Sequence, residues 1–448
     1  MASSSGDKKR CLFLEAAFSG DLKLMKTLSK LLDTCDGFLA KRVESIKDHD
    51  GRTALHLAAE QGKANVCEFL IGEVKMDVNL RDRKGNTPLH CAILEDHSHI
   101  AVSLLENGAN PNAATGQKFT PLHYAAKRGC RKVLQLLISK GAEIDAQADS
   151  GTPLQEAASL RMDEAVKILL DNNANPNLTF RHLFSPLLLS LCAGSIECVK
   201  QLLKAGADPN MRTVGPTPLE YAASLGDTKS IKYLLDEGAL PNMASNLGLT
   251  PVEVAARQGH HTAVEILFPV TSSIASVADW SCAGIMKHFQ SIEVKKKLEQ
   301  RKNEQFVLFK SKGQDAFNRK DYHDAIYCYT EAECLEPMDA RVKSNRSLCW
   351  ACLNEGYRAL ADGQKSLLLD PKWQKAYYRE GVGWKLLKDF EKAADSFYIG
   401  WRLDVGNKEL LQAYREARQM QIQQAAAAAP AREPCFDGCC CCANRQNL

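Results

Sequence analysis

Two cationic side chains, Lys375 and Arg379, stand one helical turn apart in the segment KWQKAYYRE. On one helix face two like charges repel each other, so the pair does not stabilise a helix by itself. Such a pair either solvates a surface or binds an anion, because Lys and Arg donate charge-assisted hydrogen bonds to carboxylate groups. The neighbouring elements of the chain decide between these two interpretations.

A period of 34 residues runs through the segment that surrounds this pair. Alanine and proline recur at that spacing, at Ala325, Ala359, Ala393, Pro337 and Pro371. A fixed period of this length is typical of stacked helix pairs. We predict three such pairs and a closing helix, over residues 306–339, 340–373, 374–407 and 408–420.

The register of the first helix in each predicted pair separates a packed side from a polar side. Positions 4, 7, 8 and 11 fall within about 100° of arc, at roughly 100° per residue, and positions 2, 5, 6 and 9 fall opposite. The polar residues at the second set of positions are Lys310, Gln314, Asn345, Lys375 and Arg379. We expect these five side chains to face one groove. Residues 303–407 contain 16 Lys+Arg and 16 Asp+Glu, so the positive charge is local to that groove.

These helix pairs resemble tetratricopeptide (TPR) repeats of the dicarboxylate-clamp type found in co-chaperones. The words FKSKGQ, SNRS and KAYYR stand where that family has KEKGN, SNR and KxYxR-like words. The resemblance implies that the groove binds the Glu-Glu-Val-Asp C-termini of cytosolic heat-shock chaperones of the ninety- and seventy-kilodalton classes. Gln314 departs from the family's asparagine by one methylene, which affects the affinity or the choice of peptide.

Two alternatives to this clamp follow from the same residues. The cations of the groove could pair internally with nearby acids such as Asp315, which would make the groove a structural feature. A groove that accepts some other peptide would serve a general scaffold and would ignore a free C-terminal carboxylate. Loss of peptide binding on substitution of Lys375 or Arg379 favours the clamp over internal pairing, and loss on amidation of the peptide's C-terminus favours it over a groove for another peptide.

A second period occupies residues 51–268. Seven words of the type TPLH recur there 32 to 34 residues apart, beginning at Thr53, Thr87, Thr120, Thr152, Ser185, Thr217 and Thr250. An Ala-rich helix follows each word, and a second helix and a turn such as GANPNA complete the unit. The Thr caps a helix that Pro begins, and Asn-Pro-Asn suits an exposed hairpin tip.

This second pattern resembles the ankyrin-repeat family, with seven repeats over 51–268 and a degenerate capping repeat over 10–50. The resemblance implies helix pairs joined by short β-hairpin loops, with a long concave surface for protein partners. We interpret His56, His90 and His123 as hydrogen-bonding residues within the repeats, because stacking keeps them from converging on a metal. The fifth repeat has Leu188 at this position, which indicates either tighter core packing or a local patch for a partner.

Residues 269–305 follow neither period. We predict a linker helix there, with Ile285, Phe289 and Ile292 on one side. The basic cluster of Lys295–Lys297 and Arg301–Lys302 suits a nuclear signal or a phosphate patch or, more simply, a solvated helix face. The predicted fold class is thus all-α, with two stacked helical solenoids. The order of the two arrays and the joint DWSCAGIMKHFQS resemble a group of plant ankyrin–TPR proteins.

The 17 cysteines divide into 12 that are scattered among the repeats and five in the tail. The scattered cysteines suit small apolar fillers in a reducing compartment. Cys349 and Cys352 match C-x-x-C, but a thiol oxidoreductase would need a thiolate at a helix N-terminus, and this word lies toward a helix end. A packing role is therefore the preferred interpretation, and an oxidoreductase is the remote alternative.

The tail cysteines are Cys435, Cys439, Cys440, Cys441 and Cys442. Acylation of this run would tether an otherwise soluble scaffold to a membrane, since stable anchoring takes two or more lipid chains. An inert tail is the simpler interpretation. The run lacks a second spaced pair of ligands, so we predict no metal site. Residues 1–9 and 421–448 are predicted to be disordered.

The composition of the 448-residue chain is that of an ordinary globular protein, with a net charge of +3. Such a charge gives no general attraction to nucleic acid, and no uncharged apolar run reaches about 18 residues. Glu15 interrupts the first apolar patch, which argues against a signal peptide. We find no phosphate loop, HExxH or GxSxG, and expect neither enzymatic activity nor a cofactor. The prediction is a cytoplasmic adaptor that links a chaperone to a client or signalling protein.

Overall fold

The computed structural model shows a helical protein with two compact units. It describes residues 5–33, 37–179, 184–213 and 215–428. The first unit comprises residues 1–313 and 330–335, and the second comprises residues 314–329 and 336–448. Within the described residues there is no β-strand, and one antiparallel bridge joins Ala148 to Gly151.

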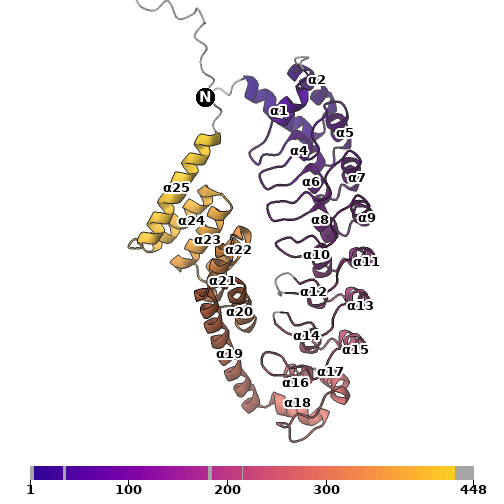
Figure 1. The fold of residues 1–448 in the computed structure, drawn as a ribbon, viewed down its shortest axis with the longest axis vertical. Helices are drawn as coiled ribbons and strands as arrows, with labels where there is room; N and C mark the ends of the chain where they lie inside the picture. Colours follow the sequence, from indigo (N-terminus) through magenta and orange to yellow (C-terminus); the bar gives the residue numbers. More distant parts are fainter. Residues whose placement is uncertain (1–4, 34–36, 180–183, 214, 429–448) are drawn as a thin grey trace, which may run out of the picture. The chain divides into compact units, whose positions relative to one another are not determined.

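The first unit is built from helix pairs that repeat along the chain. From Ala54 to Leu267 the described helices form seven pairs, and each first helix packs against the first helix of the next pair. Figure 1 shows these first helices, α4 to α16, in one column and the second helices, α5 to α17, in another. The bounds are α4 Ala54–Glu60, α5 Ala64–Gly72, α6 Pro88–Leu94, α7 Ser98–Glu106, α8 Pro121–Arg128, α9 Arg131–Ser139, α10 Pro153–Ser159, α11 Asp163–Asp171, α12 Pro186–Ala193, α13 Ile196–Lys204, α14 Pro218–Leu225, α15 Thr228–Asp236, α16 Pro251–Gln258 and α17 His261–Leu267.

The start of each first helix is fixed by the residues of the TPLH-type word. In the first repeat the backbone N–H of Thr53 donates to Nδ1 of His56 at 3.2 Å, and Nε2 of His56 lies 3.1 Å from the carbonyl oxygen of Asn86. His123 makes the same two contacts with Thr120 and Gly151. The predicted hydrogen-bonding role is therefore confirmed for His56 and His123, and each of these two caps also joins one repeat to the next. His90 accepts the Thr87 N–H at 3.0 Å, but its Nε2 atom has no hydrogen-bond partner among the described residues.

Burial keeps these histidines neutral. His56, His90 and His123 are completely buried. Burial lowers the pKa of His56 and lowers the pKa of His90 and of His123 to about 4, because the charged ring loses its hydration. In the fifth repeat Leu188 is buried as well, which supports the packing interpretation of that residue over a partner patch.

The loops between the pairs differ from the predicted β-hairpins. They stack through isolated backbone bonds, for example from Arg83 N–H to the carbonyl oxygen of Asp50 at 2.9 Å and from Gly116 N–H to that of Lys84 at 2.8 Å. Within a loop, the Asp82 carboxylate accepts the backbone N–H groups of Lys84 and Asn86. Side-chain oxygens thus accept hydrogen bonds from backbone N–H groups that would pair between the two strands of a β-hairpin. The described loops therefore contain no strand.

Three shorter helices precede the repeats: α1 Ser5–Ser19, α2 Leu22–Leu32 and α3 Leu39–Glu44. The prediction that residues 1–9 are disordered is wrong from Ser5 onward, and residues 1–4 lie outside the described residues. Helix α1 buries Phe13, Ala16 and Ala17 against the repeats. No proline stands between Ser5 and Phe13 to end the helix, so it continues toward the N-terminus.

The predicted linker is two helices with a break at Ser291. Helix α18 (Cys282–Gln290) buries Ile285, Met286 and Phe289 against α16 and α17, and so closes the end of the ankyrin stack. Helix α19 (Ile292–Asn318) then runs through the predicted boundary at 305 as one element of 27 residues. Ile292 does not share the buried side, because it begins the new helix after an extended Ser291 and is 86% exposed.

The second unit continues the helix pairs of the C-terminal array. The bounds are α20 Tyr322–Leu335, α21 Ala340–Cys352, α22 Gly356–Leu369, α23 Gln374–Leu386, α24 Phe390–Leu403 and α25 Lys408–Ala428. The last six residues of α20, Thr330–Leu335, belong to the first unit. Each helix from α21 to α25 packs against the next, and α21 also contacts α23. Helix α25 extends past the predicted end at 420, because its Ala-rich run favours helix. Residues 429–448, including the five tail cysteines, lie outside the described residues.

Candidate functional site

The predicted anion site is centred on helix α23, whose position is set by close packing against α22. A Cβ atom added at Gly383 would lie 2.6 Å from the Cα atom of Leu360 and 2.7 Å from its nitrogen. A Cβ atom at Gly363 would lie 2.9 Å from the nitrogen of Glu380. Only glycine allows the two backbones to approach this closely. The glycines therefore hold α23, with both of its predicted cations, at a fixed place beside α22.

Arg379 is half-buried and its charge is not neutralised. Its guanidinium lies 5.7 Å from the ring centroid of Tyr378 and, among the described residues, forms no ion pair. Its Nε atom is buried without a hydrogen-bond partner in the described structure. Burial lowers the pKa of Arg379, while electrostatic interactions with Tyr378, Cys349, Cys352 and Glu409 oppose this change. A buried donor without an acceptor is costly, and an anionic ligand would satisfy it.

Lys375 lies one turn before Arg379 and is exposed to solvent. Within the described part of the chain, no carboxylate lies within ion-pair distance of its amine and no hydrogen bond is formed by it. The predicted alternative, in which the cations pair with acids such as Asp315, thus does not hold for Lys375 and Arg379. The two side chains keep a charge available to a ligand.

Asn345 and Tyr329 form a second polar contact within this unit. Asn345 lies on α21 and hydrogen-bonds to the hydroxyl group of Tyr329. Tyr329 is almost completely buried, with 1% of its surface exposed. Burial raises the pKa of Tyr329 to about 12, and the bond with Asn345 acts in the opposite direction. Asp315 also acts electrostatically on Tyr329. The α19 turn that carries Gln314 and Asp315 therefore lies within electrostatic range of the α21 residue Asn345.

Gln314 and Lys310 occupy successive turns of α19. Gln314 is exposed, and its amide donates a hydrogen bond to Oδ1 of Asn318 at 3.0 Å. The Lys310 amine lies 4.7 Å from the ring centroid of Phe306. Lys310 belongs to the first unit, whereas Gln314, Asn345, Lys375 and Arg379 belong to the second. The convergence of all five residues on one groove stays a prediction.

The sequence marks Cys349 and Cys352 on α21 by their spacing, but it does not show that they act electrostatically on Arg379. Cys349 is buried and Cys352 is exposed at the end of α21, and Tyr322 hydrogen-bonds to the Cys352 thiol. The period of 34 gives these residues no special position, although the C-x-x-C word marks them. Burial raises the pKa of Cys349 to about 12, which is opposite to the lowered value that a reactive thiol requires.

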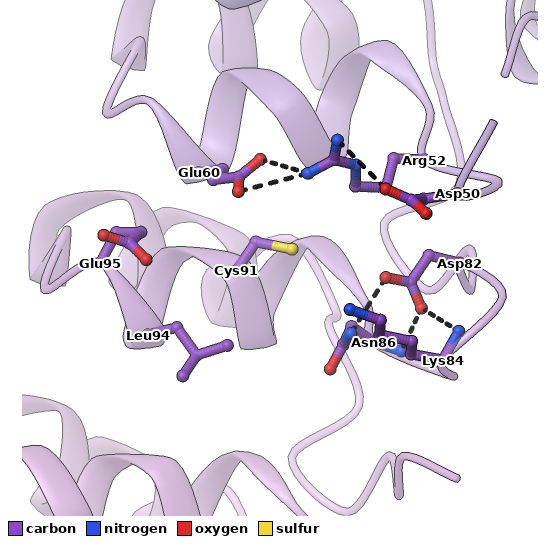
Figure 2. Close-up of a pocket in the computed structure, with 9 residues that line it drawn as sticks. All are labelled: Asp50, Arg52, Glu60, Asp82, Lys84, Asn86, Cys91, Leu94 and Glu95. Atoms are coloured by element: carbon purple, nitrogen blue, oxygen red, sulfur yellow. Dashed lines mark hydrogen bonds and ion pairs between the residues drawn. The ribbon is translucent and has the colours of Figure 1, made fainter. Parts of the chain in front are cut away.

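The first unit offers a separate cavity between its first two repeats (Figure 2). Loop residues and helix residues line it together: Asp50, Arg52, Glu60, Asp82, Lys84, Asn86, Cys91, Leu94 and Glu95. Arg52 crosses this space and pairs with Glu60 at 3.0 Å and with Asp48 at 2.8 Å. Asp48, His49 and Asp50 are close enough to share a metal ion, but the carboxylates of Asp48 and Asp50 already form ion pairs with Arg52, so we assign no metal.

Comparison with known proteins identifies the repeats of the first unit. A family profile described as ankyrin repeats (3 copies) matches residues 13–115, 112–180 and 187–276. The ankyrin repeat protein nuc-2 of Neurospora crassa is 27% identical over 220 residues, which are 49% of this chain and 20% of that protein. The ankyrin repeat domain of human ASB11 matches 48% of this chain and 98% of its own, with 31% identity and a TM-score of 0.45.

A relative of another kind also matches. The Hsp70-Hsp90 organizing protein of Triticum aestivum is 37% identical over 116 residues, which are 26% of this chain and 20% of that protein. The chain thus spans about a fifth of the length of these two curated relatives. No helix among the described residues is both long and apolar enough to cross a membrane.

Proposed function

The chain belongs to the ankyrin-repeat family of protein-interaction modules, and we propose that it is a non-enzymatic adaptor with a TPR-type chaperone clamp in its second unit. In this proposal Lys310, Gln314, Asn345, Lys375 and Arg379 bind the acidic C-terminal peptide of a heat-shock chaperone of the ninety- or seventy-kilodalton class. The ankyrin repeats hold a client or signalling protein. A cytoplasmic location goes with this function.

The observation that carries the proposal is the state of Arg379. A guanidinium that is half-buried, has a lowered pKa and lacks an ion-pair partner among the described residues is costly to the folded protein. Lys375 adds a second cation without a partner one turn away. A chain-terminal Asp has two carboxylates within a few ångströms, which suits two adjacent cations better than a single side-chain carboxylate.

A comparison supports the same proposal. The wheat relative is named as an organizing protein of Hsp70 and Hsp90, and it matches this chain with 37% identity over 116 residues. The helix starts at Ala340 and Gln374 are also those that the 34-residue frame requires. A stack of helix pairs in that frame brings the first helix of each pair to the same side.

A titration of the full-length chain tests the clamp. We would measure the binding of a peptide that ends in Glu-Glu-Val-Asp and of the same peptide amidated at its C-terminus. Each charge-assisted bond contributes about 1.5–3 kcal/mol, so Lys375→Ala or Arg379→Ala should weaken binding by about 10- to 150-fold. Amidation should have a similar effect, and binding should weaken as salt rises.

Lys372→Ala is the matched control. Lys372 is exposed three residues before Lys375 and carries the same charge. Its replacement by Ala therefore changes the net charge near the start of α23 by the same amount. Its effect on peptide binding should stay below about threefold, the size of a screened surface interaction. Equal binding of the free acid and the amide, or equal loss with Lys372→Ala and Lys375→Ala, would overturn the clamp.

A further inference from the structure

The cavity between the first two repeats shows which register positions of the first helices face the ankyrin groove. Glu60 stands seven residues after Thr53, and Leu94 and Glu95 stand seven and eight residues after Thr87. All three line the cavity together with loop residues of the same repeats (Figure 2). Positions seven and eight after each capping Thr or Ser therefore line the side of the stack that carries the loops.

The same two positions change character along the stack. At position seven the residues are Glu60, Leu94, Lys127, Ser159, Cys192, Ser224 and Arg257, and at position eight they are Gln61, Glu95, Arg128, Leu160, Ala193, Leu225 and Gln258. The groove thus has an acidic zone in repeats one and two, which contains Glu60 and Glu95, and a cationic zone in repeat three, which contains Lys127 and Arg128. An apolar zone follows in repeats four to six and contains Leu160, Cys192, Ala193 and Leu225.

A contact between neighbouring repeats shows that the register holds in the apolar zone. Tyr221 stands four residues after Thr217, as Cys91 of the cavity stands four after Thr87. The Tyr221 hydroxyl group hydrogen-bonds to the Cys192 thiol of the preceding repeat, and burial raises the pKa of Tyr221 to about 12. Positions four and seven therefore face the same groove here as they do in repeats one and two.

The cationic zone has charge to offer a ligand. Lys127 and Arg128 end helix α8 and are exposed. Neither forms an ion pair with any residue in the part of the chain that the structure describes. The acidic zone lies next to it, and Arg52 neutralises only part of that zone, since Glu95 is exposed and unpaired among the described residues. A ligand with carboxylates is attracted to repeat three and repelled from repeats one and two.

The apolar zone has large side chains in solvent. Leu160 is 40% exposed and Leu225 is 55% exposed, and the exposed Cys192 lies on the helix between them. Helices α10, α12 and α14 pack side by side, at a spacing of about 8–10 Å for packed helices. Leu160 and Leu225 are therefore about 16–20 Å apart, and Arg128 is about 8–10 Å beyond Leu160. Together these side chains expose more apolar surface than the single leucines that are common on protein surfaces.

We propose that the ankyrin groove binds a peptide segment of a partner protein with carboxylates at one end and apolar side chains at the other. The carboxylates contact Lys127 and Arg128, and the apolar side chains cover Leu160, Cys192 and Leu225. The acidic zone lies on the other side of the cationic zone from the apolar zone, so it disfavours a segment whose carboxylates extend past repeat three into repeats one and two. An extended chain rises about 3.3 Å per residue, so about three residues separate the carboxylates from the first apolar side chain.

This inference rests on the proposal that the ankyrin repeats hold a protein partner, and it is independent of the clamp. The test is a selection from a random 16-residue peptide library displayed with its C-termini fused to the carrier. The bait is the full-length chain with Lys375→Ala and Arg379→Ala, which removes the clamp. We expect enriched peptides in which two or more Asp or Glu are separated by about three residues from two or more large apolar residues.

Variants of the bait locate the binding of an enriched peptide. We expect Lys127→Glu with Arg128→Glu to weaken it at least tenfold, and Leu160→Asp or Leu225→Asp to do the same. The controls are Lys132→Glu with Lys140→Glu, an equal charge change at exposed positions outside the groove, and Leu240→Asp, at a leucine that is 54% exposed in a loop. If an aspartate variant is unfolded by circular dichroism, Leu160→Ser and Leu225→Ser replace it.

Three outcomes would overturn the inference. The enriched peptides could lack the paired acidic and apolar blocks, they could be basic and lose affinity on Glu95→Gln, or their binding could be equally sensitive to the control variants. None of these outcomes affects the clamp, which the titration with free and amidated peptides decides. A failed clamp titration likewise leaves the groove selection unchanged.

Discussion

Protonation of His123 should destabilise the protein below pH 6.5, and the structure sets the size of the effect. His123 is completely buried, Nδ1 accepts the Thr120 N–H at 3.1 Å, and Nε2 lies 3.1 Å from the carbonyl oxygen of Gly151. Both ring nitrogens are thus used by the neutral ring. A proton on Nδ1 would face the Thr120 N–H and break the helix cap.

The pKa values give the magnitude and the sign. The ordinary histidine pKa is 6.5, and burial lowers the pKa of His123 to about 4 in the folded chain. Between these values the unfolded chain binds more protons, so the free energy of unfolding falls as the pH falls. At pH 5 the loss from His123 is about 2 kcal/mol relative to pH 8.

The chain contains its own control for this experiment. The fourth repeat has Gln155 at the histidine position, where Oε1 accepts the Thr152 N–H at 2.8 Å and Nε2 donates to the carbonyl oxygen of Phe184 at 2.7 Å. His123→Gln should therefore keep both contacts but lose the titration. The other histidines are present in both proteins, so their titration cancels in the difference.

The assay is urea unfolding followed by circular dichroism at pH 8 and pH 5. We expect His123→Gln to change stability by less than about 1 kcal/mol at pH 8, and to exceed the wild type by about 2 kcal/mol at pH 5. A difference between the two proteins that is the same at both pH values would refute the reasoning. Thermal midpoints provide a second measure if the repeats unfold in more than one step.

Three further predictions concern the second unit. Gly383→Ala should destabilise it by about 1–3 kcal/mol in thermal or urea unfolding, because the added methyl group meets the backbone at Leu360. Asp362→Ala should cost about 3–5 kcal/mol, since this buried carboxylate accepts from Arg346 at 2.7 and 2.8 Å and from Trp350 at 3.1 Å. Gln314→Asn should bind the Glu-Glu-Val-Asp peptide more tightly in the same titration, because the shorter amide restores the family's reach.

The periods of the sequence predict the starts of the helices because the caps are local. Thr53 and His56 lie three residues apart and make their contacts within one turn, so their spacing alone predicts the helix. The frame of 34 residues likewise predicts starts at Ala340 and Gln374, where α21 and α23 begin. A local pattern of this kind needs no knowledge of the tertiary structure.

The ends of the helices and the loops could not be predicted in this way. Helix α19 continues through residue 305 because no proline, glycine or cap interrupts its sequence there, although a period begins at Phe306. Ile292 fits the apolar side of α18 by spacing, but Ser291 is extended and changes the direction of the chain. The loops use Asp and Thr side chains as acceptors, and a hairpin signature does not show this alternative.

The candidate site was predicted by residue type and not by environment. Lys375 and Arg379 share a helix face, yet Lys375 is exposed and Arg379 is half-buried with a lowered pKa. Spacing cannot separate them, because the difference comes from the helices that pack against α23, such as α21 and α22. The three zones of the ankyrin groove were missed for a related reason. Each position looks ordinary in its own repeat, and only alignment of the seven repeats by their caps shows the change of character.

The two proposed surfaces make a distinction that one experiment can use. Both surfaces contain exposed cations, which are Lys375 in the clamp and Lys127 and Arg128 in the ankyrin groove. Both should therefore bind acidic ligands less tightly as the salt concentration rises. Only the clamp needs a free C-terminal carboxylate, because two adjacent cations there match two adjacent carboxylates. Only the groove needs an apolar segment, because Leu160 and Leu225 extend it by about 16–20 Å. An internal acidic segment without apolar residues should therefore bind neither surface well, and one that did bind tightly would contradict the assignment of two separate specificities.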